Sequence, residues 1–150
     1  NVSARPAEAN AKWLRRERFD RVLVDAPCSG IGVLRRHPDT RHRLTADQVD
    51  RVCQTQAAIL DEVAPLVSPG GRLIYATCSV LREENQTQVQ SFLGRHPEFA
   101  LVPVAEIWAR VGLLGDPPGL VPEGLLLSPR RSATDGFFVS ILTRALGAHP

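Results

Sequence analysis

The chain has 150 residues, of which 43% are hydrophobic and 23% charged, and its formal net charge is +2. This composition is typical of one soluble globular domain, and no apolar run approaches the roughly 20 residues that a transmembrane helix needs. The N-terminus has no apolar signal-peptide core and no initiator Met, so we expect a cytoplasmic piece of a longer protein.

The first predicted elements form a strand–helix–strand unit. FDRVLVD, residues 19–25, predicts a buried strand because a Val-rich run ends at Pro and Gly. A long helix follows, with a capping-box signature at Thr45 and Gln48, and runs to the Ser-Pro-Gly-Gly of residues 68–71. Its apolar face consists of Val49, Val52, Cys53, Ile59, Leu60, Val63 and Leu66. RLIYATCS, residues 72–79, predicts a second strand, parallel to the first.

The second half of the chain predicts one more helix and two more strands. These are a helix over residues 81–95, a strand over 99–104, a Pro- and Gly-rich loop over 112–123 and a last strand over 137–142. Glu83 and Glu84 fall in the first turn of that helix, where acids favour a helix N-terminus.

Together these elements predict an α/β fold, a partial doubly wound, Rossmann-like sheet whose last strand is antiparallel. Residues 1–18 are expected to be a linker or loop region. Residues 19–144 are expected to form the βαβ core and the closing strands, and residues 145–150 a tail.

Two thiols and a carboxylate lie where the first two predicted strands end. Asp25, Pro27 and Cys28 follow the first strand, and Cys78 follows the second. One crossover joins the two strands, so we expect them to be neighbours. Ligands of open α/β sheets bind outside the carboxyl ends of the strands. Asp25, Cys28 and Cys78 are therefore predicted to share one pocket.

The residues alone leave three interpretations of the thiols open. A cysteine can merely fill core space, which is the interpretation for Cys53 on the apolar helix face. A hydrolase nucleophile needs an activating histidine, and none falls at a predicted strand end. The third interpretation is attack on an electron-poor ring with a carboxyl group nearby. The cysteines form no CxxC pair, so they predict no metal site and favour a reducing compartment.

A basic stretch follows the first cysteine motif. RRHPDTRHR, residues 35–43, contains four Arg and two His against one Asp. Arg35 and Arg36 are candidates for substrate binding through phosphate contacts, although a solvated basic loop would give the same pattern.

The motifs DAPCSG at residues 25–30 and ATCS at residues 76–79 resemble those of the Fmu/Sun-type (NOL/NOP/Sun) RNA cytosine-5 methyltransferases, which use S-adenosylmethionine. The resemblance continues through GGRLIYATCSVLREENQTQV to LSPRRSATDGFF, over most of the chain. It implies the C-terminal part of a class I methyltransferase catalytic domain. The earlier strands and the glycine-rich loop that form most of the family's cofactor site are not in this sequence.

The resemblance also implies roles for single residues. Cys78 matches the nucleophile that attacks C6 of cytosine through a covalent adduct. Cys28 matches the cysteine associated with product release. Asp25 matches the acid that contacts the flipped base, and it is the residue expected to touch the cofactor. Pro27 matches the residue that holds the loop close to the base, and Asn85 an Asn that supports the active-site loop.

The function that the resemblance implies is methyl transfer from S-adenosylmethionine to C5 of a cytosine in RNA, with ribosomal RNA as the preferred class. Two other functions stay open. One is methylation of a base amino group, which needs no thiol, and the other is a noncatalytic RNA-binding or assembly module. We expect no membrane partner. The sequence leaves open the oligomeric state and the acceptor of the C5 proton, for which Cys28, a water and Asp25 are candidates.

Overall fold

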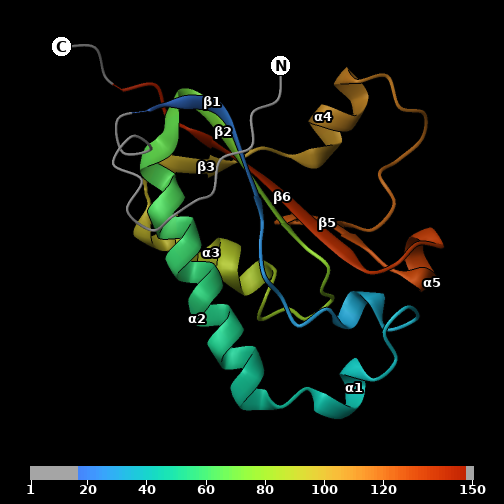
Figure 1. Cartoon of the computed structure of the whole chain (residues 1–150). Helices are drawn as coiled ribbons and strands as arrows, with labels where there is room; N and C mark the ends of the chain where they lie inside the picture. The colour runs from blue at the N-terminus through green and yellow to red at the C-terminus, as the bar shows by residue number, and fades with distance from the viewer. Residues whose placement is uncertain (1–16, 148–150) are drawn as a thin grey trace.

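The computed structural model describes residues 17–147, so most of the predicted linker and the last three residues of the predicted tail lie outside the described residues. The longer elements are β1 (Phe19–Asp25), α2 (Ala46–Val63), β2 (Val67–Thr77), α3 (Gln86–Arg95) and β6 (Phe137–Arg144). The shorter ones are η2 (Ile31–Val33), α1 (Thr40–Arg43), η3 (Ala64–Leu66), β3 (Phe99–Leu101), α4 (Val104–Arg110), β4 (Leu120–Val121), β5 (Gly124–Leu127) and α5 (Pro129–Ser132) (Figure 1). No helix among the described residues is long and apolar enough to cross a membrane.

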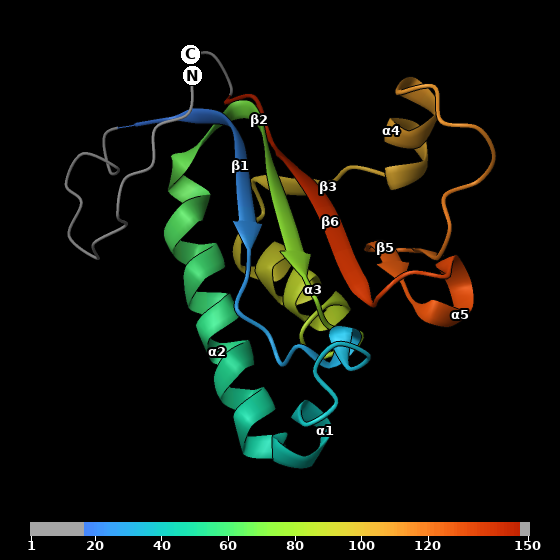
Figure 2. The same ribbon diagram turned by 45° about the vertical axis from the view of Figure 1, so that its right-hand side comes forward.

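Six strands form one mixed sheet. Its order is β1-β2-β6-β5-β4, and β3 pairs with β6. β1 and β2 are parallel, in register from Arg21 opposite Arg72 to Asp25 opposite Ala76. β6 runs antiparallel to β2, and Figure 2 shows these three strands side by side. The predicted α/β fold, with its βαβ unit and antiparallel last strand, is confirmed.

The core lies between one face of the sheet and the helices α2 and α3, which lie together on that face (Figure 2). Alternate residues of β2 point into it, so Leu73 and Tyr75 are fully buried. Leu60 of α2, Phe92 of α3 and Phe138 of β6 fill the space between these layers. This packing fixes β2 beside β1 and places the ends of both strands.

The helix α2 begins where the sequence predicts and ends earlier. Thr45 and Gln48 form the predicted capping box: Thr45 Oγ1 accepts from the Gln48 backbone N–H at 3.3 Å, and Gln48 Oε1 accepts from the Thr45 backbone N–H at 3.0 Å. The prediction that the helix runs to residues 68–71 is wrong, because Pro65 has no backbone N–H to continue it. The Ser-Pro-Gly-Gly segment instead lies inside β2, where the register with β1 shifts.

The helix α3 begins later than the sequence predicts. It starts at Gln86 rather than at residue 81. Glu84 and Asn85 are fully buried, and their side chains bond to the loops that follow β1 and β2 instead of lying in a helical turn. The sequence position of Glu84, next to Glu83, predicts an acid in the first turn of the helix, and this prediction is wrong for Glu84.

The predicted elements near the C-terminus are also revised. The strand predicted over residues 99–104 ends at Leu101, because Pro103 lacks the N–H of a strand ladder and is followed by α4. The loop predicted over residues 112–123 contains β4, which forms a hairpin with β5. The last strand, predicted over residues 137–142, extends two residues further.

Within residues 17–147, β1 is an edge strand. It is the first strand in the sheet order, so its outer side has no strand partner among the described residues. Leu23 of β1 is 67% exposed, which is unusual for a leucine in the middle of a strand. The unpaired backbone N–H and C=O groups of this edge favour pairing with a further strand.

Two glycines let three loops at the carboxyl ends of β1 and β2 pack backbone against backbone. The Gly32 N–H donates to the Cys78 carbonyl at 3.0 Å, and the Gly136 N–H donates to the Gly32 carbonyl at 2.8 Å. A Cβ at Gly32 would lie 2.2 Å from the Gly136 carbonyl oxygen and 2.7 Å from that of Cys78. Only glycine fits here, because backbone atoms cannot move aside as a side chain can.

We expect Gly32→Ala to lower the free energy of unfolding by about 1–3 kcal/mol, the usual cost of overpacking. Urea denaturation of the variant and the wild type measures this change. Gly94→Ala is the matched control: Gly94 lies in α3 with open space around it, so alanine there should raise stability by up to about 1 kcal/mol. Equal stability of Gly32→Ala and the wild type would contradict the close packing.

Candidate active site

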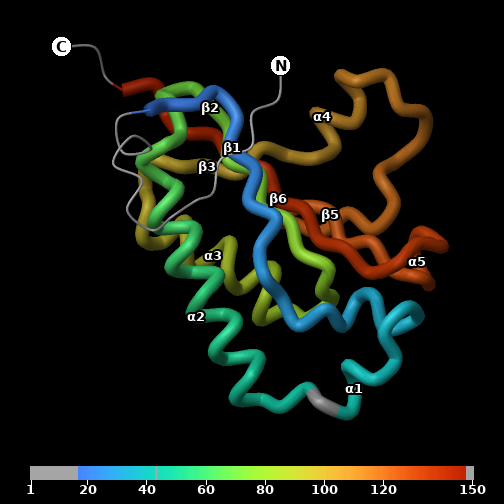
Figure 3. The backbone as a smooth tube through the Cα atoms, in the orientation of Figure 1, coloured from blue at the N-terminus to red at the C-terminus, as the bar shows by residue number. Residues whose placement is uncertain are grey.

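The two motif cysteines meet at the carboxyl ends of β1 and β2. Cys28 follows β1 after two residues, and Cys78 follows β2 directly. The two strands end at the same side of the sheet (Figure 3). The Sγ atoms are 2.9 Å apart, and both cysteines are free thiols and half-buried. The structure thus brings together the thiols that the sequence places at neighbouring strand ends.

The protonation of Cys28 follows from its surroundings. Burial is the largest cause, followed by the hydrogen bond with Cys78, and together they raise the pKa of the Cys28 thiol from 9.0 to about 12. Cys28 therefore keeps its proton at neutral pH and can donate its S–H to Cys78 Sγ. In this arrangement the Cys28 thiol can be the donor and Cys78 Sγ the acceptor of the contact between them.

This pKa predicts how Cys28 reacts with iodoacetamide, because only the thiolate is alkylated at a useful rate. In the folded protein we expect Cys28 to be alkylated far more slowly than in urea, at a rate that still rises beyond about pH 10, because the thiolate fraction grows until the pH reaches the pKa of about 12. In urea, the rate should level off above about pH 9, because the pKa of the thiol returns to 9.0 without burial. Peptide mass spectrometry at each pH measures both rates. A rate that levels off near pH 9 in the folded protein would show that burial does not raise the pKa of this thiol.

A buried carboxylate lies behind the two cysteines. Glu84 is fully buried and accepts four hydrogen bonds. The donors are the Ser29 backbone N–H at 2.8 Å, the Ser79 hydroxyl at 2.6 Å, the Gln56 amide at 3.1 Å and the Ser29 hydroxyl. This role was not predicted from the sequence, in which the signal was an acid five residues after Ser79 of the second cysteine motif.

The loop that contains Cys78 is held by a second buried side chain. Asn85 Oδ1 accepts from the Thr77 hydroxyl at 2.6 Å, and Asn85 Nδ2 donates to the Ser79 carbonyl at 2.9 Å. These contacts lie on both sides of Cys78. The Tyr75 hydroxyl donates to the backbone carbonyl of Glu84, the residue before Asn85, at 2.7 Å. Burial raises the pKa of Tyr75, so its hydroxyl stays a donor.

Asp25 and Pro27 precede Cys28 in the chain and have different surroundings. The Asp25 side chain, at the end of β1, is exposed and has no hydrogen bond or ion pair to the side chains described in residues 17–42 and 44–147. The Pro27 carbonyl accepts from the Gln56 amide at 2.9 Å, which ties this loop to α2. Asp25 is thus free to contact a ligand, and Pro27 is part of the rigid backbone beside it.

Arg35 and Arg36 are held by one acid. Arg36 Nε donates to Asp135 Oδ2 at 2.7 Å, and Arg35 Nη2 lies 3.3 Å from Asp135 Oδ1. The arginine side chains are 77% and 66% exposed, whereas Asp135 is 8% exposed. The pair therefore anchors the start of the basic stretch to the turn before β6 while both guanidinium groups still face solvent.

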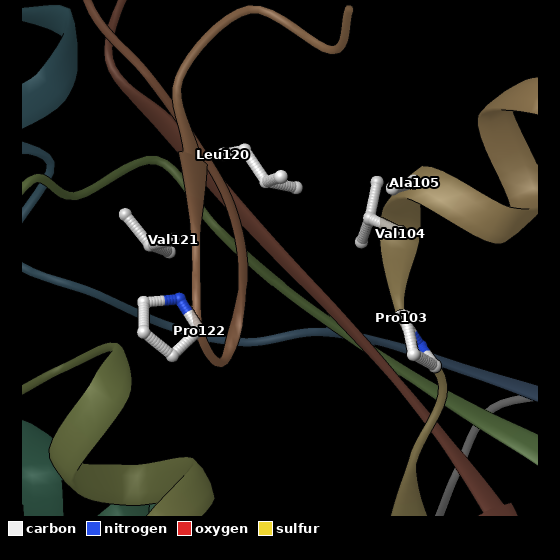
Figure 4. A pocket seen from close by; sticks show the side chains of 6 residues that line it. All are labelled: Pro103, Val104, Ala105, Leu120, Val121 and Pro122. Atoms are coloured by element: carbon white, nitrogen blue, oxygen red, sulfur yellow. The ribbon is translucent and has the colours of Figure 1, made fainter.

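Two depressions differ in what they offer to a ligand. One of ≈ 350 Å³, seen in Figure 4, lies between the start of α4 and the β4 hairpin. Its lining contains no ionisable or nucleophilic side chain: Pro103, Val104, Ala105, Leu120, Val121 and Pro122. The other, of ≈ 420 Å³, is lined by Ser29, Thr40, Leu44, Gln48, Arg51 and Val52, so it adjoins the Cys28 loop. Among residues 17–147, no cluster of three His, Cys, Asp or Glu side chains could hold a metal ion.

Comparisons with known proteins match most of the chain. A family model described as 16S rRNA methyltransferase RsmB/F matches residues 2–143. Ribosomal RNA small subunit methyltransferase B of Salmonella agona is 52% identical over 91 residues, which is 61% of this chain and 21% of that protein. The chain thus spans about a fifth of the length of the curated relatives it matches.

Solved structures show the same fold. The crystal structure of PH0851 is 41% identical, with a TM-score of 0.70 over 82% of this chain and 26% of that chain. The structure of NSun6 from Pyrococcus horikoshii with SFG has a TM-score of 0.65 at 22% identity, over 87% of this chain and 33% of that one.

Proposed function

Because the chain belongs to the 16S rRNA methyltransferase RsmB/F family, we propose that it forms the base-activating part of an RNA cytosine-5 methyltransferase. The observation that supports this function most directly is the 2.9 Å contact between the thiols of Cys28 and Cys78. Cytosine C5 is a poor nucleophile until a thiolate adds at C6, so this chemistry needs a cysteine. A base methylated on its amino group needs none.

In the proposed reaction, the Cys78 thiolate adds to C6 of a cytosine that has left its base stack. The electron pair of the C5–C6 double bond moves toward C5, which becomes nucleophilic. After C5 has been methylated, loss of its proton to a base restores the double bond and expels the Cys78 thiolate. Cys28 keeps its proton at neutral pH, so its S–H stabilises that thiolate when it attacks and when it leaves.

Other residues of the site bind the substrate in this proposal. The exposed Asp25 carboxylate contacts the pairing edge of the base, and the Pro27 backbone holds the loop against it. Arg35 and Arg36 reach RNA phosphates with the donors that Asp135 leaves free. Ribosomal RNA is the proposed substrate, since the matched family model and the Salmonella relative are described as ribosomal RNA methyltransferases.

S-adenosylmethionine is the proposed methyl donor, and the residues of this chain do not form its pocket alone. Asp25 is the residue proposed to touch it, yet Asp25 lines neither of the two depressions beside the sheet. The unpaired edge of β1 lies next to it. We therefore assign most of the cofactor site to other parts of the parent protein, meaning the longest available polypeptide that contains residues 1–150.

Nucleoside analysis tests the proposed reaction. The parent protein is incubated with labelled S-adenosylmethionine and small-subunit ribosomal RNA that lacks the modification, and the digested RNA is analysed by mass spectrometry. We expect the label in 5-methylcytidine. Label in an N-methylated nucleoside would favour amino methylation. RNA binding without any label, in a folded protein that binds the cofactor, would favour a noncatalytic module.

A further inference from the structure

One buried carboxylate joins the two loops that contain the cysteines. Ser29 directly follows Cys28, and its backbone N–H and hydroxyl both donate to Glu84. Ser79 directly follows Cys78, and its hydroxyl donates to the same carboxylate at 2.6 Å. The two serine hydroxyls lie 3.4 Å apart. Both cysteines are therefore one residue away from a contact with Glu84.

Burying the Glu84 side chain costs more free energy than burying an apolar core residue. Acidic side chains are almost never fully buried unless they are paired, and Glu84 has no ion-pair partner among the side chains described in residues 17–42 and 44–147. Its carboxylate is satisfied by neutral donors from the two cysteine loops and by Gln56 of α2. Hydrogen bonds to a charged acceptor are roughly twice as strong as neutral ones, so these contacts hold the loops firmly.

The backbone hydrogen bond between the loops does not hold the thiols directly. The Gly32 N–H donates to the Cys78 carbonyl, which fixes the backbone on one side of Cys78. The Cys28 side of the pair is fixed through Ser29, and Ser29 is held mainly by Glu84. Without the carboxylate, the Cys28 loop keeps the Gln56 contact at Pro27 and the Gly32 contact, but it loses the two hydrogen bonds from Ser29 that are nearest to the thiol.

We propose that Glu84 is a positioning residue, whose carboxylate sets the distance between the Cys28 and Cys78 thiols by binding Ser29 and Ser79 together. This role rests on the proposed function, because that function requires both thiols to act on one base. Glu84 touches neither sulfur, so it acts through the two serines. Losing the carboxylate should separate the thiols and lower turnover more than substrate binding.

The distance can be tested without any methylation, through the tendency of the two thiols to form a disulfide. The parent protein with Cys53→Ala is equilibrated with reduced and oxidised glutathione. Cys28 and Cys78 then lose two electrons and two protons to glutathione disulfide, which becomes two glutathione thiols. Alkylation and peptide mass spectrometry give the disulfide fraction, and from it the effective concentration of one thiol at the other.

Glu84→Gln and Ser79→Ala should each lower this effective concentration by about tenfold or more, the effect of losing a hydrogen bond to a charged group. The matched control is Glu83→Gln, since Glu83 is the exposed neighbour of Glu84, and it should stay within about twofold of the wild type. An unchanged value in both Glu84→Gln and Ser79→Ala would overturn the proposal and leave Glu84 a core residue.

Melting temperature and kinetics separate positioning from general stability. If Glu84→Gln and Ser79→Ala fold, with melting temperatures above the assay temperature, we expect kcat to fall at least tenfold with KM within about threefold of the wild type. Lower melting temperatures with unchanged effective concentration and kcat would contradict positioning. A lowered effective concentration together with no methylation by the wild-type protein would reject the proposed function and leave the positioning role intact.

Discussion

Replacing Cys78 by serine is expected to abolish methyl transfer in the parent protein. The hydroxyl of serine is a far weaker nucleophile than a thiolate, and C5 is not activated without addition at C6. By analogy with the removal of other covalent nucleophiles, the loss in kcat should be at least ~10⁴-fold. Incorporation of labelled methyl groups into ribosomal RNA measures it.

The control for this variant is Cys53→Ala. Cys53 is a half-buried thiol of α2, and it takes no part in the contact between Cys28 and Cys78. Its removal should leave kcat within a few-fold of the wild type. If Cys78→Ser retained activity within tenfold of the wild type, covalent activation by Cys78 would be wrong, and methylation of an amino group would take its place.

Replacing Cys28 by serine should separate the first methylation from turnover. Cys78 is intact in this variant, so addition to C6 and methylation still occur. The serine hydroxyl is a weaker acid than the thiol, and its shorter C–O bond places it farther from Cys78 than the Cys28 sulfur, which lies 2.9 Å away. Expulsion of the Cys78 thiolate is therefore less well assisted, so the adduct should accumulate and turnover should fall by about 10²–10³-fold. Denaturing gel electrophoresis with labelled RNA detects this as a protein–RNA band that survives sodium dodecyl sulfate.

The double variant Cys28→Ser with Cys78→Ser is the matched control for that band. It has no nucleophile, so the band should disappear. A Cys28→Ser protein that turns over normally and forms no stable band would show that Cys28 is not needed for product release. A band in the double variant would place the covalent bond on another residue.

Features of the fold that depend on residues close together in the sequence were predictable from it. The bounds of β1 coincide with the predicted strand, because a Val-rich run followed by Pro and Gly is a local signal. The start of α2 was predictable for the same reason, since its capping box lies within four residues. The end of α2 was predicted too late because the Pro-Gly-Gly of β2 resembles a turn and is instead a bulge beside β1.

The two cysteine motifs were also visible in the sequence, and the Sun-type resemblance is confirmed by the family match over residues 2–143. The role of Glu84 was not predictable, because it depends on a contact with Ser29, 55 residues earlier in the chain. From local spacing, Glu84 resembles a helix N-terminal acid. The pairing of Arg36 with Asp135, separated by 99 residues, was hidden in the same way.

The measurement that tests the central claim most directly is covalent trapping by RNA that contains 5-azacytidine, followed by peptide mass spectrometry. The parent protein and the 150-residue chain are compared side by side. We predict an adduct on Cys78 in the parent protein, lost in Cys78→Ala and retained in Cys28→Ala. Trapping by the parent alone would show that the chain needs the rest of that protein. A folded, active parent with no adduct on either cysteine would contradict the cytosine-5 mechanism.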